Sequence, residues 1–177
     1  MKRITALIFM VIMLLAFAGC SQEPEAVQEG VLPVPGEGFR VGFGRASITP
    51  QEKLPLGGYG TSSTRIMEDV LDDIYVDCIA MTDENDLTVL LMLVDMQRIE
   101  ESLIDLLRIS VNEATGVPQD RIIISCSHTH SVPDLTMNSH EGIARYKGLL
   151  VERFAQSAVA ALRDSLPAQL YGGTTQT

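Results

Sequence analysis

The sequence predicts an α/β domain built on a mixed β-sheet with flanking helices. Two apolar runs, residues 75–82 and 87–94, enclose the polar turn 83–86, which predicts an antiparallel hairpin. The second run is almost continuously apolar, as in a strand that is covered on both faces. It is followed by a helical pattern at 97–115 and by another apolar run at 121–125. A strand, a helix and a strand in this order form a right-handed βαβ unit with parallel strands.

Three further elements complete the predicted domain. Residues 39–46 alternate weakly between apolar and polar and lead into a turn at 47–50, which predicts a strand. The helix at 97–115 is ended by Gly116, and a longer helix is predicted at 141–165. Residues 169–171 are a candidate for a last strand.

The first residues have the features of an export signal. A basic start and an apolar run over 4–18 predict a secretory signal peptide at residues 1–19. The segment Phe17-Ala18-Gly19-Cys20 resembles the bacterial lipobox, so we expect Cys20 to be lipidated, although a chance cysteine after an ordinary signal peptide is the alternative. Residues 20–38 are acidic and contain prolines and glycines, which favours a disordered tether. The expected location is the bacterial cell envelope, outside the cytoplasm, with the protein anchored to a membrane by lipid.

The charge of the chain bears on its possible partners, and its cysteines bear on a possible disulfide. The chain carries a formal net charge of −10 and shows no basic cluster that could bind phosphate backbones, so nucleic acid is not an expected partner. Cys78 and Cys126 lie inside strand-like runs. They could pair in an oxidising compartment, but we favour two buried thiols.

The candidate chemistry lies in the segment Ser125–Asp134. It contains His128 and His130, two of the three histidines of the chain. Residues i and i+2 of an extended segment point to the same side, so both imidazoles can face one point. Asp95 ends the preceding parallel strand, and ligands of open α/β sheets sit at such carboxyl ends. One carboxylate and two imidazoles suit a divalent metal, whereas the alternatives are a helix cap at Asp95 and hydrogen-bonded loop histidines.

Three further features of the sequence give weaker indications of a functional role. Asp134 could accept a hydrogen bond that orients an imidazole, or could be a solvated loop acid. The glycine-rich segment 56–60 either lets the backbone approach a ligand closely or forms a flexible turn. His140 precedes the long helix and is predicted to be a surface residue.

Several segments, in the same order along the chain, resemble those of the neutral/alkaline (non-lysosomal) ceramidases. The run 124–134 is similar to the family's Thr-His-Thr-His-Ser-Gly-Pro segment, and 41–50 is similar to its opening Gly-x-Gly-x-x-x-x-Ile-Thr. Gly58-Tyr59-Gly60 resembles its early Gly-Tyr. Asp73-Ile74-Tyr75 and Val94-Asp95 resemble two further segments of bacterial relatives, so the resemblance covers residues 39 to about 173.

This resemblance implies a zinc-dependent amidase that cleaves the N-acyl bond of ceramide. It implies that His128 is a zinc ligand and that His130 is a catalytic residue beside the metal and the substrate, with Tyr59, Asp95 and Asp134 as candidates around them. Zinc would polarise the amide carbonyl and activate water. The family's other metal ligands and its catalytic serine lie further along than position 177. The resemblance therefore implies the N-terminal part of a larger α/β catalytic domain, at residues 39–177, and we expect this part to be inactive alone.

Two alternatives remain open at this stage. A metallo-β-lactamase-like hydrolase would have Asp-His where this chain has Val132 and Pro133, which argues against it. A non-catalytic surface lipoprotein could bind a lipid or a protein partner through the same loop.

Overall fold

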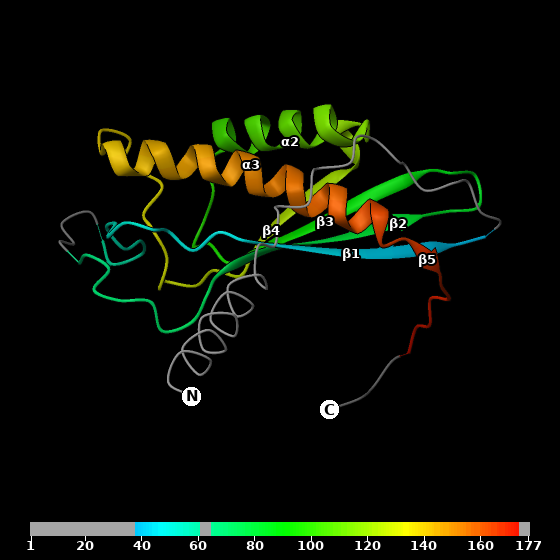
Figure 1. The fold of residues 1–177 in the computed structure, drawn as a ribbon, viewed down its shortest axis with the longest axis horizontal. Coiled ribbons are helices and arrows are strands. Elements are labelled where there is room, and N and C mark those ends of the chain that lie inside the picture. Colours follow the sequence, from blue (N-terminus) through cyan, green and yellow to red (C-terminus); the bar gives the residue numbers. More distant parts are fainter. Residues whose placement is uncertain (1–37, 61–64, 174–177) are drawn as a thin grey trace, which may run out of the picture. The chain divides into compact units, whose positions relative to one another are not determined.

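The computed structural model describes residues 38–60 and 65–173, which belong to one compact unit, Leu32–Thr177. In this part of the chain a five-stranded sheet lies under two long helices (Figure 1). The strands are β1 (Arg40–Ser47), β2 (Tyr75–Thr82), β3 (Thr88–Val94), β4 (Ile122–Cys126) and β5 (Leu166–Pro167). The helices are α2 (Glu101–Thr115), α3 (Glu141–Arg163) and the short 3₁₀ helix η1 (Gln119–Arg121).

The strand order β4-β3-β2-β1-β5 confirms the predicted mixed sheet with its βαβ unit. β2 pairs antiparallel with β1 and with β3, whereas β3 and β4 are parallel and α2 connects them. The predicted strand at 169–171 was wrong. Instead, Leu166 and Pro167 pair with the start of β1.

Helix α2 begins four residues later than predicted. The amide of Asp95 donates to the carbonyl of Tyr75 at 3.0 Å, and the carbonyl of Met96 accepts from the amide of His128 at 3.0 Å. These bonds hold the chain after β3 in the sheet edge, so it cannot yet turn into a helix. Glu100 is the N-cap residue, and the interpretation of Asp95 as the helix cap is therefore wrong.

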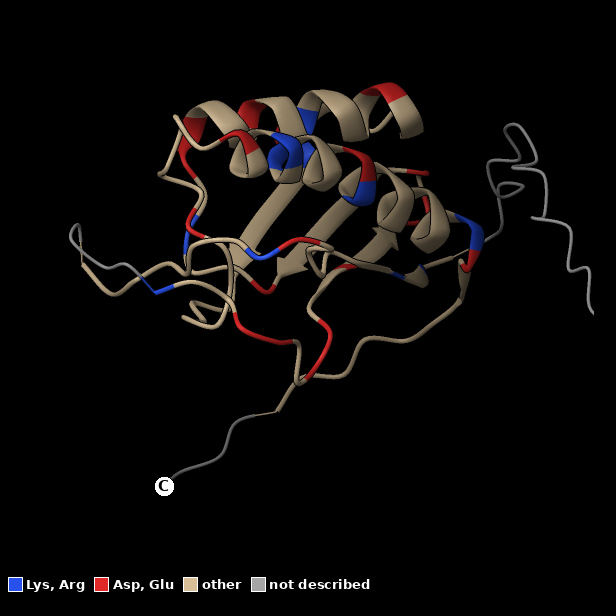
Figure 2. Cartoon of the chain, turned by 60° about the vertical axis from the view of Figure 1, so that its left-hand side comes forward, with Lys and Arg blue, Asp and Glu red and all other residues tan. Residues whose placement is uncertain are grey.

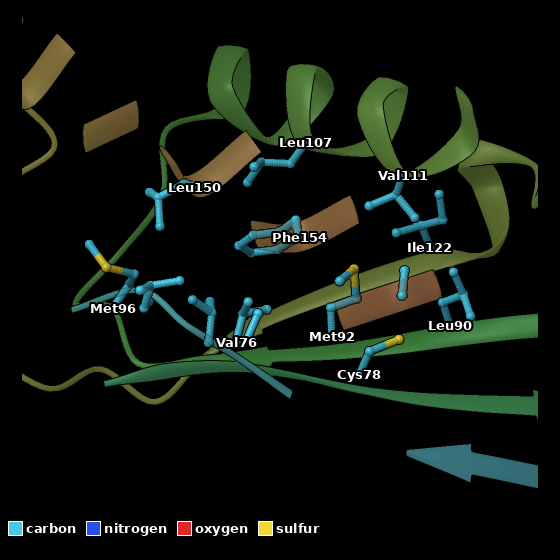
Figure 3. Close-up of a cluster of buried hydrophobic side chains, with 14 of the residues drawn as sticks. Val76, Cys78, Leu90, Met92, Met96, Leu107, Val111, Ile122, Leu150 and Phe154 are labelled. Carbon is cyan, nitrogen blue, oxygen red and sulfur yellow. The ribbon is translucent and has the colours of Figure 1, made fainter. Parts of the chain in front are cut away.

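The hydrophobic core lies between the sheet and the two helices (Figure 3). Phe154 of α3 is fully buried and lies among side chains from β2, β3 and α2. Cys78 and Met92 face it from the sheet, and Leu107 and Val111 face it from α2. Because every second residue of each central strand points to this layer, the alternation of the sequence determines which side chains form the core.

Two glycines of β1 allow α3 to lie directly on the strand. A Cβ atom on Gly42 would lie 2.0 Å from the carbonyl oxygen of Ala161, and one on Gly44 would lie 2.0 Å from that of Ser157. The Gly-x-Gly of this segment therefore has a packing role.

None of the helices in residues 38–60 and 65–173 is long and apolar enough to cross a membrane. The predicted signal peptide, Cys20 and all but the last residue of the predicted tether lie outside the described residues.

Candidate functional site

The histidine segment turns away from the sheet directly after β4. The amide of Ser127 donates to the carbonyl of Val94 at 3.0 Å, and His128 then adopts a φ of +61°. A left-handed conformation is uncommon for a residue other than glycine and is enriched at functional sites. The ring centroids of His128 and His130 lie 5.4 Å apart, with an interplanar angle of 60°. The structure thus brings the two imidazoles together, but through a turn beyond the strand rather than through strand alternation.

The glycine-rich loop holds the imidazole of His130. The amide of Gly57 donates to the carbonyl of Val132 at 2.9 Å, which joins this loop to the histidine segment. Gly58, with a φ of +83°, lies so close to the ring that a Cβ atom would be 2.3 Å from Nδ1 of His130. The close approach that glycine permits here is to a side chain of the site itself.

Tyr59 links the cluster to Arg65, a residue that the sequence did not indicate. The ring of Tyr59 meets the ring of His130 edge-on, at 5.6 Å between centroids. The guanidinium carbon of Arg65 lies 4.1 Å from the centroid of the Tyr59 ring, within the range of a cation–π contact. Arg65 lies in an irregular segment without a motif, so no sequence signal could have assigned it to this site.

Asp95 connects two strands at the same edge of the sheet. Its Oδ2 accepts a hydrogen bond from the amide of Tyr75 at 3.1 Å, which ties the end of β3 to the start of β2. The structure does not place Asp95 in a metal-binding group with the two histidines. Within the described ranges, no group of three or more His, Cys, Asp or Glu side chains could hold a metal ion.

The carboxylate of Asp134 stabilises a local turn. Its Oδ1 accepts hydrogen bonds from the amide of Thr136 at 3.0 Å and from the hydroxyl of the same residue at 2.7 Å. It therefore shapes the loop after the histidines. His140 is exposed at the start of α3, as the sequence predicted.

The two described cysteines are free thiols: Cys78 is buried, as predicted, whereas Cys126 is only half-buried. Burial raises the pKa of Cys78 to about 12. Burial also raises the pKa of the half-buried Cys126, and a hydrogen bond from the backbone of Ile99 partly opposes that shift. Both thiols face the helix layer, so neither is a candidate nucleophile.

A cleft of about 1050 Å³ lies beside the histidine segment. Thr129 and Ser131, which alternate with the histidines, line it together with Asp95. Its walls also contain the apolar side chains Leu56, Ile66, Met67, Val70, Leu71 and Ile74. The lining thus mixes apolar and charged side chains, and it includes the residues on either side of His130 but neither imidazole.

The comparisons with known proteins bear on the fold. Neither the scan against protein-family models nor the search of curated proteins gave a match. Solved structures do match, among them a ceramidase in complex with C2 and the neutral ceramidase from Pseudomonas aeruginosa. The TM-score is 0.64 for both, with sequence identities of 15% and 17%. The chain has the fold of part of a neutral ceramidase.

The match to the ceramidases covers 75% of this chain and 22% of each ceramidase chain. This chain therefore spans less than a quarter of the length of each ceramidase chain that it matches. At sequence identities of 15% and 17%, the likeness shows the fold alone. For the fold, it confirms the resemblance to ceramidases that the sequence shows.

Proposed function

We propose that this chain supplies part of the active site of a zinc-dependent amidase that acts on ceramide-like N-acyl lipids. One observation carries the proposal: the His128–His130 pair lies at the carboxyl end of β4 in a domain with the fold of a ceramidase. Ligands of open α/β sheets bind at this edge.

The donors near the histidines fit a zinc site only in part. A catalytic zinc takes about three protein ligands, and the described residues offer two neighbouring imidazoles without a third donor. His128 is exposed, so its imidazole is accessible to a metal. We propose His128 as one ligand and polypeptide outside the described residues as the source of the others. When bound, zinc would supply a Lewis acid for the amide carbonyl.

His130 has a different environment, which suits a role beside the substrate. Its ring is half-buried, and Gly58 and Tyr59 fix its orientation. Gly58 crowds Nδ1 and Cε1, so Nε2 is the nitrogen that is left to exchange a proton with the substrate. A fixed imidazole is the usual general acid or base near neutral pH.

The apolar part of the cleft supports a lipid substrate. Pockets of about 300–1,000 Å³ with mostly apolar walls and a few polar groups are typical of small-molecule sites. This cleft combines apolar walls with the hydroxyls of Thr129 and Ser131, and charged side chains lie among its lining residues: Lys53, Arg65, Glu68, Asp69, Asp72 and Asp95. We infer that it takes a hydrocarbon chain of the substrate, with the amide directed across Thr129–Ser131 toward the imidazoles. A lipid anchor at Cys20 would keep the protein at the membrane that holds such substrates.

The test compares the 177-residue chain with the complete gene product. We expect the 177-residue chain to bind zinc weakly in isothermal titration calorimetry and to release no fatty acid from a fluorescent ceramide. We expect the complete gene product to contain one zinc, by elemental analysis, and to hydrolyse the ceramide. His128→Ala should abolish both properties, because it removes a ligand.

His140→Ala is the matched control, because it removes the one histidine that lies away from the pair. It should leave zinc content and hydrolysis unchanged. Stoichiometric zinc and turnover in the 177-residue chain would contradict the proposal. Lipid binding without hydrolysis, unchanged by His128→Ala, would favour the non-catalytic lipoprotein instead.

A further inference from the structure

The face of the sheet opposite the helices is apolar across four strands. Cross-strand pairing places Phe43 beside Ile79, Ile79 beside Leu91 and Leu91 beside Ile123, so one apolar row runs from β1 to β4. A second row contains Val41, Met81 and Val89. We call the following side chains the open face: Val41, Phe43, Ile79, Met81, Val89, Leu91, Leu93 and Ile123.

The open face is unusual for the surface of a finished domain. Phe43, Leu93 and Ile123 are 48%, 41% and 50% exposed, although they are large and apolar. Leu93 and Ile123 also belong to the parallel pair β3–β4, and parallel strands are normally covered on both faces. Figure 1 shows both α2 and α3 on the other side of the sheet. A contiguous apolar patch of this kind marks an interaction surface.

The charges on this side of the sheet are already paired with each other. Arg45 donates to both carboxylate oxygens of Asp77, at 2.6 and 2.8 Å. The guanidinium carbon of Arg45 also lies 4.6 Å from the centroid of the Tyr75 ring. In Figure 2 the strands are mostly uncharged, whereas charged positions mark the helices and loops. The partner of the open face is therefore apolar rather than a charged polymer.

We propose that the open face packs against a second β-sheet, which belongs to polypeptide of the same enzyme outside these 177 residues. The argument comes from the length of the matched ceramidases. The match covers only 22% of each ceramidase chain, so most of such a protein lies outside the part that resembles this chain. Apolar rows that cross neighbouring strands suit sheet-on-sheet packing, in which the two layers lie about 10 Å apart. A second copy of this chain is disfavoured, because two chains with a net charge of −10 repel each other. The proposal rests on the likeness of fold and not on the proposed reaction.

The experiment measures the accessibility of the open face by thiol labelling. Ile123→Cys places a thiol on the open face, and Leu106→Cys, at a position 54% exposed on α2, is the matched control. The rate of labelling by N-ethylmaleimide is compared between the 177-residue chain and the complete gene product, and labelling of the native cysteines in each parent protein is subtracted. We expect Ile123→Cys to react at least tenfold more slowly in the complete product and Leu106→Cys to react equally in both.

Several results would overturn the proposal. These are equal labelling of Ile123→Cys in both proteins, a gene product that is no longer than this chain, and protection that grows with the concentration of the 177-residue chain. Protection of that chain by phosphatidylglycerol vesicles would also overturn it, in favour of a membrane. If Ile123→Cys does not fold, carbene footprinting of Phe43 and Leu93 in the unaltered proteins gives the same comparison. None of these measurements depends on zinc or hydrolysis, so the two proposals can fail separately.

Discussion

Gly58→Ala tests whether the glycine loop positions His130. The added Cβ atom would lie 2.3 Å from Nδ1 of the imidazole, where ordinary contacts begin at 3.4 Å, so an overlap of more than 1 Å must be relieved. Overpacking of this kind costs about 1–3 kcal/mol. The φ of +83° adds about 1–2 kcal/mol for a residue with a Cβ atom. We therefore expect Gly58→Ala to lower the free energy of unfolding by about 2–5 kcal/mol.

Gly60→Ala separates the two contributions. Gly60 has a similar φ of +87°, but a Cβ atom added there would meet nothing within 4 Å, so this variant should cost only the backbone part, about 1–2 kcal/mol. Urea denaturation measures both variants, and NMR of the three histidine rings reports on the site. The His130 resonances should shift in Gly58→Ala and stay in place in Gly60→Ala. Equal destabilisation by both variants, with unchanged His130 resonances, would refute the reasoning.

Two further predictions concern the core. Gly44→Ala should lower the free energy of unfolding by more than about 3 kcal/mol or prevent folding, because its Cβ atom would lie 2.0 Å from the backbone of α3. Gly148→Ala, on the exposed side of the same helix and with open space around it, should raise the free energy of unfolding by about 0.5–1 kcal/mol. Thermal denaturation measures both variants. A soluble Gly44→Ala with unchanged Tm would show that α3 does not rest on β1. Burial raises the pKa of Cys78 from 9.0 to about 12, so the folded state holds this proton more tightly than the unfolded state. The contribution of this proton to the free energy of unfolding is fully present below pH 9. It is lost as the pH rises toward 12, by up to about 1.4 kcal/mol per pH unit. Urea denaturation at pH 8, 9.5 and 10.5 measures this loss, which should shrink in Cys78→Ala, and an unchanged slope would contradict the assignment.

The sequence determined the sheet and the helices, because local pattern encodes them. The alternation and apolar content of the runs at 75–82 and 87–94 match β2 and β3 closely, and the turn between them fixes their antiparallel pairing. The strand–helix–strand order likewise fixed the parallel pair β3–β4. The pair of histidines could be located for the same reason, since the end of a strand can be read from the residues around it.

Only the tertiary structure decided what surrounds these histidines. The contacts of His130 with Gly58 and Tyr59 join segments some seventy residues apart, and the position of Arg65 over Tyr59 follows from the path of an irregular loop. The start of α2 depended on backbone hydrogen bonds between the end of β3 and the histidine segment. Periodicity reports which way a side chain points within its own strand or helix, but it carries no information on which distant segment will lie against it.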